Sequence, residues 1–432
     1  MALDSDVYWR YQNTTPSDWW LTPTFQNAGE TTLPPDLILF NTVQASNLNS
    51  ASSSHACWGL GAAAGSCSGA CSSFSWHEDN AGGYSDVTRT TNSAHPLFVY
   101  NNSDSEMRAR ILRWGSINSG RSCLVDMVDN DITAYIIATS LRFGTAPWMR
   151  GCLHAPAAAE TDWQWAMPFA PDWVWGWSNL YGGDEWHGGS SGQYSASASY
   201  TEGFAHRDGT YENWAHHDQD NQNYVNCSML YSQSKFMDLC INAASYADTV
   251  GAVTWNDNGI SCDWTNTDTS NQFRYNFIAG KNANSKVGNF KIGSDYGDGV
   301  YRSSDGTMKI TTGFKPKMVF FIGGNRTAVG GSLNIQQGRG FASEADQWAQ
   351  AMSIDDNDNT SDVQRGNWNN RCFCRLNYNS TSEYDYCSLN AMESDGFRVN
   401  VDNSGSYVVS FLALGDPPSD LVLPYQSSIL SV

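Results

Sequence analysis

The feature that most constrains this chain is one ordered set of short motifs that occurs in it three times. The series opens with a short apolar strand entered through a proline, at Pro35, Pro171 and Pro316, which lie 136 and 145 residues apart. A proline fits at strand entry because its missing N–H does no harm before ladder pairing begins. Recurrence at a near-constant spacing predicts repeated folding units.

Further landmarks follow each of these prolines in the same order. A small-residue signature comes next, at residues 59–62, 203–205 and 340–342, and then an acidic polar stretch, a turn and a closing apolar strand. Opening strands are expected at residues 8–11, 141–144 and 290–293. The sequence therefore predicts three units, residues 1–139, 140–285 and 286–416, with a C-terminal tail of residues 417–432.

Each unit has the pattern of an all-β domain. Residues 397–401 alternate in polarity and are followed by a turn and a second strand at 407–414, which predicts a hairpin, and another hairpin is expected around residues 304–306. Helical pattern is rare and amounts to two turns over residues 342–349, while the polar stretches 44–54 and 355–359 predict surface loops. We expect an all-β fold of three tandem related β-sandwich, jelly-roll-like units in one chain.

Charge and cysteine content exclude several classes of protein. The 24 basic and 44 acidic residues give a net charge of −20, which disfavours binding to nucleic acid or to an anionic membrane. The chain starts without a signal-peptide pattern and has no apolar run near the ~20 residues of a membrane span. The 11 cysteines form no paired zinc motif. We therefore expect reduced thiols, no membrane insertion and assembly in a cytoplasm.

Tryptophan is concentrated in the middle unit. Trp173, Trp175 and Trp177 alternate along one strand, so all three indoles lie on one face. Such a row favours a core or subunit contact, and the alternative is a platform that stacks on sugar rings. The candidate residues for a protein interface or a glycan contact are Trp163, Trp165, Trp173, Trp175, Trp177 and Trp186.

The sequence offers weak signals for catalysis and for a metal. Asp184 and Glu185, beside Trp186, form the most enzyme-like cluster, but one loop cannot by itself show the two separated carboxylates that a glycosidase needs. The pair at residues 216–217 is interpreted as a loop, and no catalytic residue is predicted. Asp355, Asp356 and Asp358 are spaced to bind Ca²⁺, with a solvated acidic loop as the default interpretation, and no other cofactor is expected.

The third unit carries motifs that point to a family. A proline-entered strand at residues 314–319, the Asp-Gly-Phe turn at 395–397 and the closing strand 407–415 follow one another in order. This pattern resembles β-sandwich modules of tailed-bacteriophage virion proteins, of the tail-fibre and capsid-surface type. The match is best over residues 290–415 and weaker in the other units, where Asp-Gly-Phe becomes Asn-Gly-Ile or Ser-Gly-Arg. The resemblance implies a virion setting and no catalytic residues.

These observations favour a non-enzymatic phage virion structural protein. It would be displayed on the particle as capsid decoration or as a tail-associated protein, and its partners would be neighbouring virion subunits. One alternative is a tail-fibre adhesin that binds a carbohydrate or receptor, with a host-surface glycan as its partner. A third is a polysaccharide-degrading tail protein.

Overall fold

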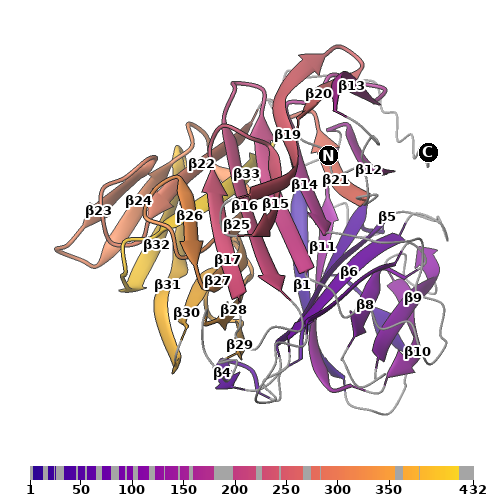
Figure 1. The fold of residues 1–432 in the computed structure, drawn as a ribbon, viewed down its shortest axis with the longest axis horizontal. Helices are drawn as coiled ribbons and strands as arrows, with labels where there is room; N and C mark the ends of the chain where they lie inside the picture. Colours follow the sequence, from indigo (N-terminus) through magenta and orange to yellow (C-terminus); the bar gives the residue numbers. More distant parts are fainter. Residues whose placement is uncertain are drawn as a thin grey trace.

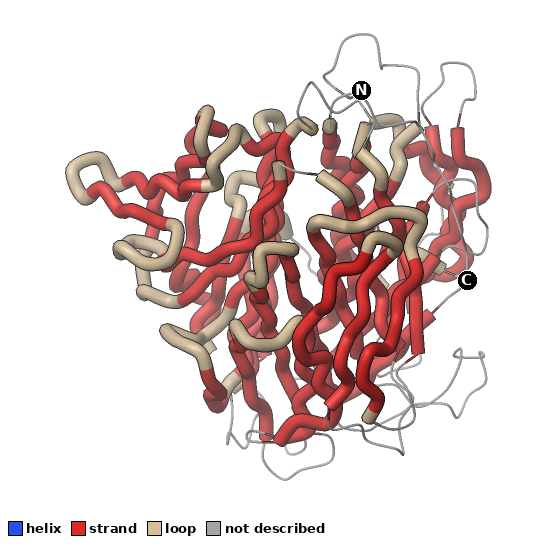
Figure 2. The backbone as a smooth tube through the Cα atoms, turned by 90° about the horizontal axis from the view of Figure 1, so that it is seen from above, coloured by secondary structure: helices blue, strands red, loops and turns tan. Residues whose placement is uncertain are grey.

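The predicted all-β fold is confirmed. The computed structural model describes residues 3–417 apart from 13–17, 24, 26–33, 45–46, 54–55, 65–70, 79–86, 93–94, 101–105, 116–121, 131, 145, 155–158, 180–197, 220–225, 243–244, 266–273, 283, 356–362 and 379. Within these residues the chain forms 33 strands and no helix (Figure 2). No described segment is therefore a helix long and apolar enough to cross a membrane.

The strands form six antiparallel sheets, two in each third of the chain. The first third, unit 1, has a large sheet in the order β1-β11-β3-β5-β6-β7 and a small sheet in the order β2-β10-β9-β8. The bounds of these strands are Asp4–Gln12 (β1), Trp19–Leu21 (β2), Leu37–Val43 (β3), Ala56–Ala64 (β5), Cys71–Glu78 (β6), Val87–Asn92 (β7), Leu97–Tyr100 (β8), Glu106–Gly115 (β9), Ser122–Asn130 (β10) and Ala134–Arg142 (β11).

Unit 2 repeats this arrangement. Its large sheet has the order β12-β21-β14-β15-β16-β17, and its small sheet has the order β13-β20-β19-β18. The bounds are Trp148–His154 (β12), Glu160–Ala166 (β13), Trp173–Asn179 (β14), Ala198–His206 (β15), Tyr211–Gln219 (β16), Asn226–Ser232 (β17), Met237–Asn242 (β18), Ser245–Asn256 (β19), Gly259–Thr265 (β20) and Arg274–Gly280 (β21).

Unit 3 has the same order again. Its large sheet runs β22-β33-β25-β27-β28-β29, and its small sheet runs β23-β24-β32-β31-β30 with β23 as an added edge strand. The bounds are Ser285–Lys291 (β22), Gly299–Arg302 (β23), Thr307–Thr311 (β24), Pro316–Gly323 (β25), Ile335–Ser343 (β27), Gln347–Ile354 (β28), Val363–Trp368 (β29), Phe373–Asn377 (β30), Ser380–Glu393 (β31), Gly396–Asn403 (β32) and Val408–Gly415 (β33).

The large sheets of the three units therefore share one strand order. In each of them the opening strand pairs with the closing strand, which pairs with the proline-entered strand, and the small-residue strand follows. Strand β11 continues through Arg142, so a division by sheets moves the first boundary from residues 139–140 to the turn after β11. The opening strand of unit 2 is β12 rather than residues 141–144. The common order supports three related units, whose shared origin stays a prediction.

The central strands of the large sheets, such as β3, β25 and β33, are buried on both faces because each large sheet packs in two directions. One face packs on the small sheet of its own unit, and this gives three separate cores. The other faces of the three large sheets meet in a single shared core. Alternation along β25 shows the division, since Phe320 joins the shared core while Phe321 joins the core of unit 3. In Figure 1 the violet, magenta and orange-to-yellow units lie side by side accordingly.

Two short strands join the large sheet of another unit. Strand β4 (Ser50–Ser53) of unit 1 pairs with β29 of unit 3, and β26 (Gly330–Leu333) of unit 3 pairs with β17 of unit 2. Both strands lie in the connection that follows the proline-entered strand. The corresponding connection of unit 2, residues 180–197, lies outside the described residues. Through these backbone hydrogen bonds, β4 joins unit 1 to unit 3 and β26 joins unit 3 to unit 2.

Three local expectations differ from the structure. Strands β32 and β33 lie in different sheets, so residues 397–401 and 407–414 do not form a hairpin; both faces of β33 are buried, which requires the middle of a large sheet. Residues 342–349 form the end of β27 and the start of β28, because Phe341 and Trp348 pair across an antiparallel turn. The stretch 44–54 contains β4. The hairpin around residues 304–306 is confirmed.

Candidate functional site

The tryptophan row of β14 lies in the shared core. Trp173, Trp175 and Trp177 are all at most 6% exposed, and their indoles face the large sheets of the other units. The ring of Trp175 lies 4.9 Å from that of Phe320 in unit 3. The row thus packs unit 2 against its neighbours in the same chain, and no indole face is available there for stacking on a sugar.

The other tryptophan candidates lie elsewhere. Trp165 is buried in the core of unit 2, where it stacks on Phe277 with ring centroids 4.7 Å apart. Trp163 is half-buried and meets Trp165 edge to face. Both lie on β13 of the small sheet, so the six candidates do not form one surface. Trp186, with Asp184 and Glu185, lies outside the described residues.

A buried ion pair joins unit 2 to unit 3 within the shared core. The Arg339 guanidinium on β27 contacts the Glu202 carboxylate on β15, and both side chains are almost fully buried. Glu202 also accepts hydrogen bonds from Trp175 Nε1 at 2.9 Å and from the Tyr200 hydroxyl at 2.8 Å. Burial raises the pKa of Glu202 well above its usual range. The indole of Trp58, from unit 1, lies 4.1 Å from the Arg339 guanidinium.

The three units therefore meet at one place. Glu202 pairs across the strand ladder with Trp177, and Arg339 pairs in the same way with Ile322; each partner lies six residues after the proline of its unit. The residue that corresponds in unit 1 is Leu60, which pairs with Asn41. An acid, a base and a leucine thus occupy corresponding positions, and all three lie in the contact region between units.

A second buried carboxylate lies between units 2 and 3. Glu212 on β16 accepts four hydrogen bonds, from Tyr231 and Gln233 of unit 2 and from Asn289 and Ser410 of unit 3. Burial raises the pKa of Glu212 to about 7, although these four donors favour the ionised form. Trp214 Nε1 donates to Ser410 Oγ at 2.9 Å and extends the network. Its partners come from two units, so this network fixes their relative position.

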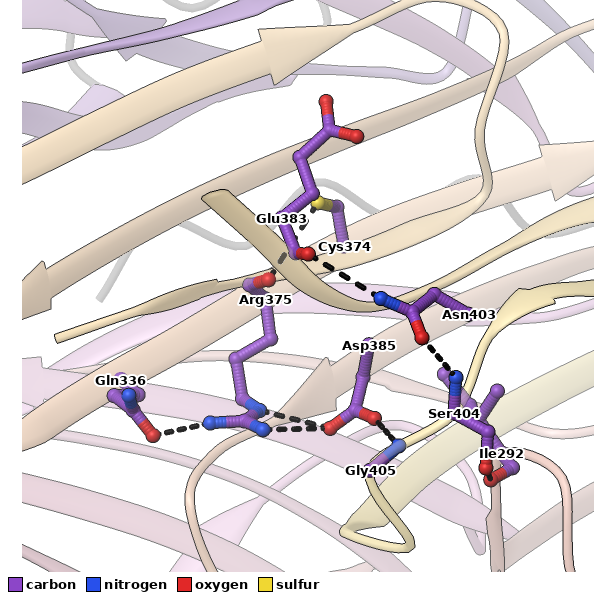
Figure 3. Close-up of polar contacts among 9 residues, drawn as sticks. All are labelled: Ile292, Gln336, Cys374, Arg375, Glu383, Asp385, Asn403, Ser404 and Gly405. Atoms are coloured by element: carbon purple, nitrogen blue, oxygen red, sulfur yellow. Dashed lines mark hydrogen bonds and ion pairs between the residues drawn. The ribbon is translucent and has the colours of Figure 1, made fainter. Parts of the chain in front are cut away.

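A third network lies inside unit 3 and is shown in Figure 3. Arg375 on β30 donates from Nε and Nη2 to Asp385 Oδ2 on β31, at 3.0 and 2.8 Å, and from Nη1 to Gln336 on β27. The Gly405 N–H donates to the other oxygen of Asp385. The network therefore links the two sheets of the sandwich to the loop between β32 and β33.

The prediction that residues 216–217 form a loop is wrong. His216 and His217 lie in strand β16 rather than in a loop, and both are buried. His217 Nδ1 lies 2.8 Å from Ser199 Oγ on the neighbouring strand, so a polar partner satisfies it in the interior. Burial lowers the pKa of His216 to about 3 and keeps that ring neutral. Residues 216–217 have the sequence pattern of a polar loop, because the polar partner that allows His217 to be buried lies on another strand, β15.

The described residues bring no metal site together. No group of three or more histidine, cysteine or acidic side chains within the described part of the chain is placed to hold an ion. Asp355 is half-buried at the end of β28, while Asp356 and Asp358 lie outside the described residues, so the calcium prediction stays untested. Cys372, Cys374 and Cys387 are buried free thiols.

Comparison with known proteins adds no family. No protein-family model matches the chain, and no curated protein sequence matches it significantly.

The sequence analysis did not find the ion pair of Glu202 and Arg339 or the Glu212 network. The ion pair could have been noticed in the sequence, because Glu202 and Arg339 each directly precede the glycine of the small-residue signature, Gly203 and Gly340. Both the ion pair and the Glu212 network are contacts between units 2 and 3.

Proposed function

We propose that this protein is a non-enzymatic structural component of a phage particle. It is displayed on the capsid or the tail and binds neighbouring virion subunits. The observation that carries the proposal is the shared order of the three large sheets around one core. A single chain with three similar units resembles a homotrimer in shape. It could therefore occupy a position of threefold symmetry in a symmetric assembly such as a phage particle.

The buried networks support a structural role. Three kinds of contact hold the units together: the strands β4 and β26, each of which joins the sheet of another unit, the ion pair of Arg339 and Glu202, and the Glu212 network. The buried charged side chains therefore stabilise the packing of one unit against another. The resemblance of residues 290–415 to virion modules supports the same proposal. The net charge of −20 gives the surface long-range repulsion, which keeps such a protein soluble before it is incorporated.

The outer sheet of unit 1 supplies candidate contacts with a virion neighbour. Trp20 on β2, Leu112 on β9 and Val128 on β10 are exposed apolar side chains of one small sheet. They are the candidates for an apolar contact on this sheet, because contiguous exposed apolar patches mark interaction sites in soluble proteins. We expect Trp20→Ala to lower incorporation into particles while the free protein stays folded. Val300→Ala is the matched control, because Val300 is an exposed apolar side chain on β23 of unit 3, and this variant should leave incorporation unchanged.

Counting the copies in purified particles tests the proposal. Quantitative mass spectrometry of particles separated on a density gradient should find the chain at a fixed ratio to the major capsid protein. Hundreds of copies would assign it to capsid decoration, and a few copies would assign it to the tail. Its absence from particles that contain all other virion proteins would contradict the proposal.

The two alternatives have less support. The adhesin interpretation depended on the indoles of β14 as a sugar platform, and those indoles are buried. A glycan array with the purified chain would nevertheless detect an adhesin, and release of reducing sugars from host polysaccharide would detect an enzyme. Either result, with no copies in the particle, would replace the structural proposal.

A further inference from the structure

Two buried cysteines of unit 3 lie with their sulfur atoms in contact. Cys372 directly precedes β30, and Cys387 lies on the neighbouring strand β31. Their Sγ atoms are 3.6 Å apart, and the Cys372 thiol also lies 3.4 Å from the backbone oxygen of Cys387, to which it can donate. The backbone N–H of Cys372 donates to the same oxygen at 3.0 Å, so the main chain holds the two residues side by side.

The distance that separates these sulfurs from a covalent bond is small. A disulfide has its sulfurs ~2.05 Å apart, so the two Sγ atoms need to approach by about 1.5 Å. Rotation about the two Cα–Cβ bonds can supply this movement. Cys372 and Cys387 both belong to the core of unit 3, whereas Cys374, two residues further along, belongs to a different apolar cluster. The geometry therefore favours Cys372 as the partner of Cys387.

An oxidant can reach this pair from the turn that precedes β30. Asn369 and Asn370 in the turn are exposed, although Cys372 itself is buried. Strand β30 is also the edge strand of its small sheet, where β31 is its one neighbour among the described strands. Turns and sheet edges open locally at a lower free energy than the middle of a sheet. A molecule as small as hydrogen peroxide therefore gains access more easily than an alkylating reagent.

We propose that Cys372 and Cys387 form a disulfide when the folded protein meets a peroxide. One thiolate attacks hydrogen peroxide, which gives a sulfenic acid and a hydroxide, and the hydroxide takes up the proton that this thiol lost. The second thiol attacks the sulfenic sulfur, and the S–S bond forms as water leaves. Two thiols and one peroxide thus become one disulfide and two waters. In a reducing cytoplasm both residues remain thiols.

The disulfide fastens the edge strand of unit 3. Residues 372–387 contain β30 and the first half of β31, so the bond closes them into a covalent loop. Such a loop restricts the unfolded chain and prevents β30 from separating from β31 at this end. The inference does not depend on where the protein acts. For a component of a phage particle, release from the cytoplasm supplies the oxidising setting.

Mass mapping of the full chain tests the proposal. The protein is purified in reductant, freed of it and treated with hydrogen peroxide while folded, and the remaining thiols are alkylated in acidic denaturant. The wild type should give peptides linked through Cys372 and Cys387. The matched control Cys374→Ala should form the same link, and Cys387→Ala should leave Cys372 without one. Alkylated Cys372 and Cys387 after the treatment, a sulfinic acid at either residue, or a link from Cys387 to Cys374 would overturn the proposal.

Thermal unfolding provides a second readout. The Tm of the peroxide-treated wild type should exceed that of the reduced protein by about 2 °C or more, and dithiothreitol should reverse the rise. Cys374→Ala should show the same reversible rise. Cys387→Ala should show none, and Cys372→Ala takes its place if that variant does not fold. An equal Tm for the wild type before and after treatment would contradict the fastening of β30.

Discussion

The guanidinium of Arg339 forms a buried ion pair with the carboxylate of Glu202, and the two residues occupy corresponding positions in neighbouring units. Leu60 occupies that position in the remaining unit. The pair crosses the contact between unit 2 and unit 3, where the side chains have little access to water. Its charges therefore make this contact specific to these two units, whereas leucine at all three positions would leave the contacts alike.

The ion pair predicts a non-additive response to substitution. Glu202→Leu alone leaves Arg339 buried opposite an apolar side chain, and should lower the free energy of unfolding by about 3–5 kcal/mol. The double variant Glu202→Leu/Arg339→Leu replaces both charges with leucine, the residue that unit 1 has at the corresponding position, Leu60. It should recover most of the lost stability. Urea unfolding of the two single variants and the double variant gives the coupling energy. Additive losses would show that the pair does not act as a unit.

The tryptophan row predicts a large loss of stability on truncation. Trp177 is fully buried in the shared core, so Trp177→Ala should cost about 3–5 kcal/mol. The matched control is Trp20→Ala on the surface of unit 1, which should change the free energy of unfolding by at most about 0.5 kcal/mol. Thermal and urea unfolding measure both. Similar small losses in the two variants would contradict the shared core.

The Glu212 network predicts a pH dependence with a defined sign. Burial raises the pKa of Glu212 from its usual 4.5 to about 7 in the folded chain, so the folded state binds this proton more tightly than the unfolded state does. Its contribution to stability is therefore fully present below about pH 4.5 and is lost as the pH rises through 7.

Glu212→Gln isolates that contribution from other titrating groups. The difference in unfolding free energy between wild type and variant should fall by up to about 3 kcal/mol from pH 4.5 to pH 8, at about 1.4 kcal/mol per pH unit at most. Buried His216, whose pKa is lowered to about 3, acts with the opposite sign below pH 6.5 in both proteins and cancels in the difference. A difference that is constant with pH would contradict the account.

Six cysteines should be unreactive in the folded chain. Cys123, Cys227, Cys262, Cys372, Cys374 and Cys387 are free and buried. Burial raises the pKa of Cys262 and Cys374, and a thiol that stays protonated reacts slowly with alkylating reagents. Mass mapping after native labelling should leave these six unmodified, while labelling in denaturant without reductant should modify them. Resistance in denaturant would show that they are oxidised.

Much of the fold could be predicted from the sequence because the large sheets are buried on both faces. That burial leaves continuous apolar runs such as residues 318–323, and the runs recur after a proline in three places. Strand β4, which joins the sheet of unit 3, could not be predicted from an apolar run. It consists of Ser50, Ala51, Ser52 and Ser53, and it pairs through its backbone, which leaves no side-chain pattern.

The candidate site was less predictable for a related reason. The tryptophan row of β14 predicted an extensive apolar contact, and its three indoles are buried in the shared core, but a row on one strand face does not show which surface covers it. Glu202 and Arg339 are separated by more than a hundred residues, and each one alone has the pattern of an ordinary charged strand residue. Their pairing depends on how two units pack, which local periodicity does not encode.

A reconstruction of purified phage particles by electron cryomicroscopy is the most direct test of the proposed function. The account predicts density for three sandwiches around one core, on the outer surface of the capsid or tail, at a position of threefold or local threefold symmetry. The contradictory result is a complete particle in which every density is assigned to other proteins, while the chain remains in the soluble fraction of the infected cell.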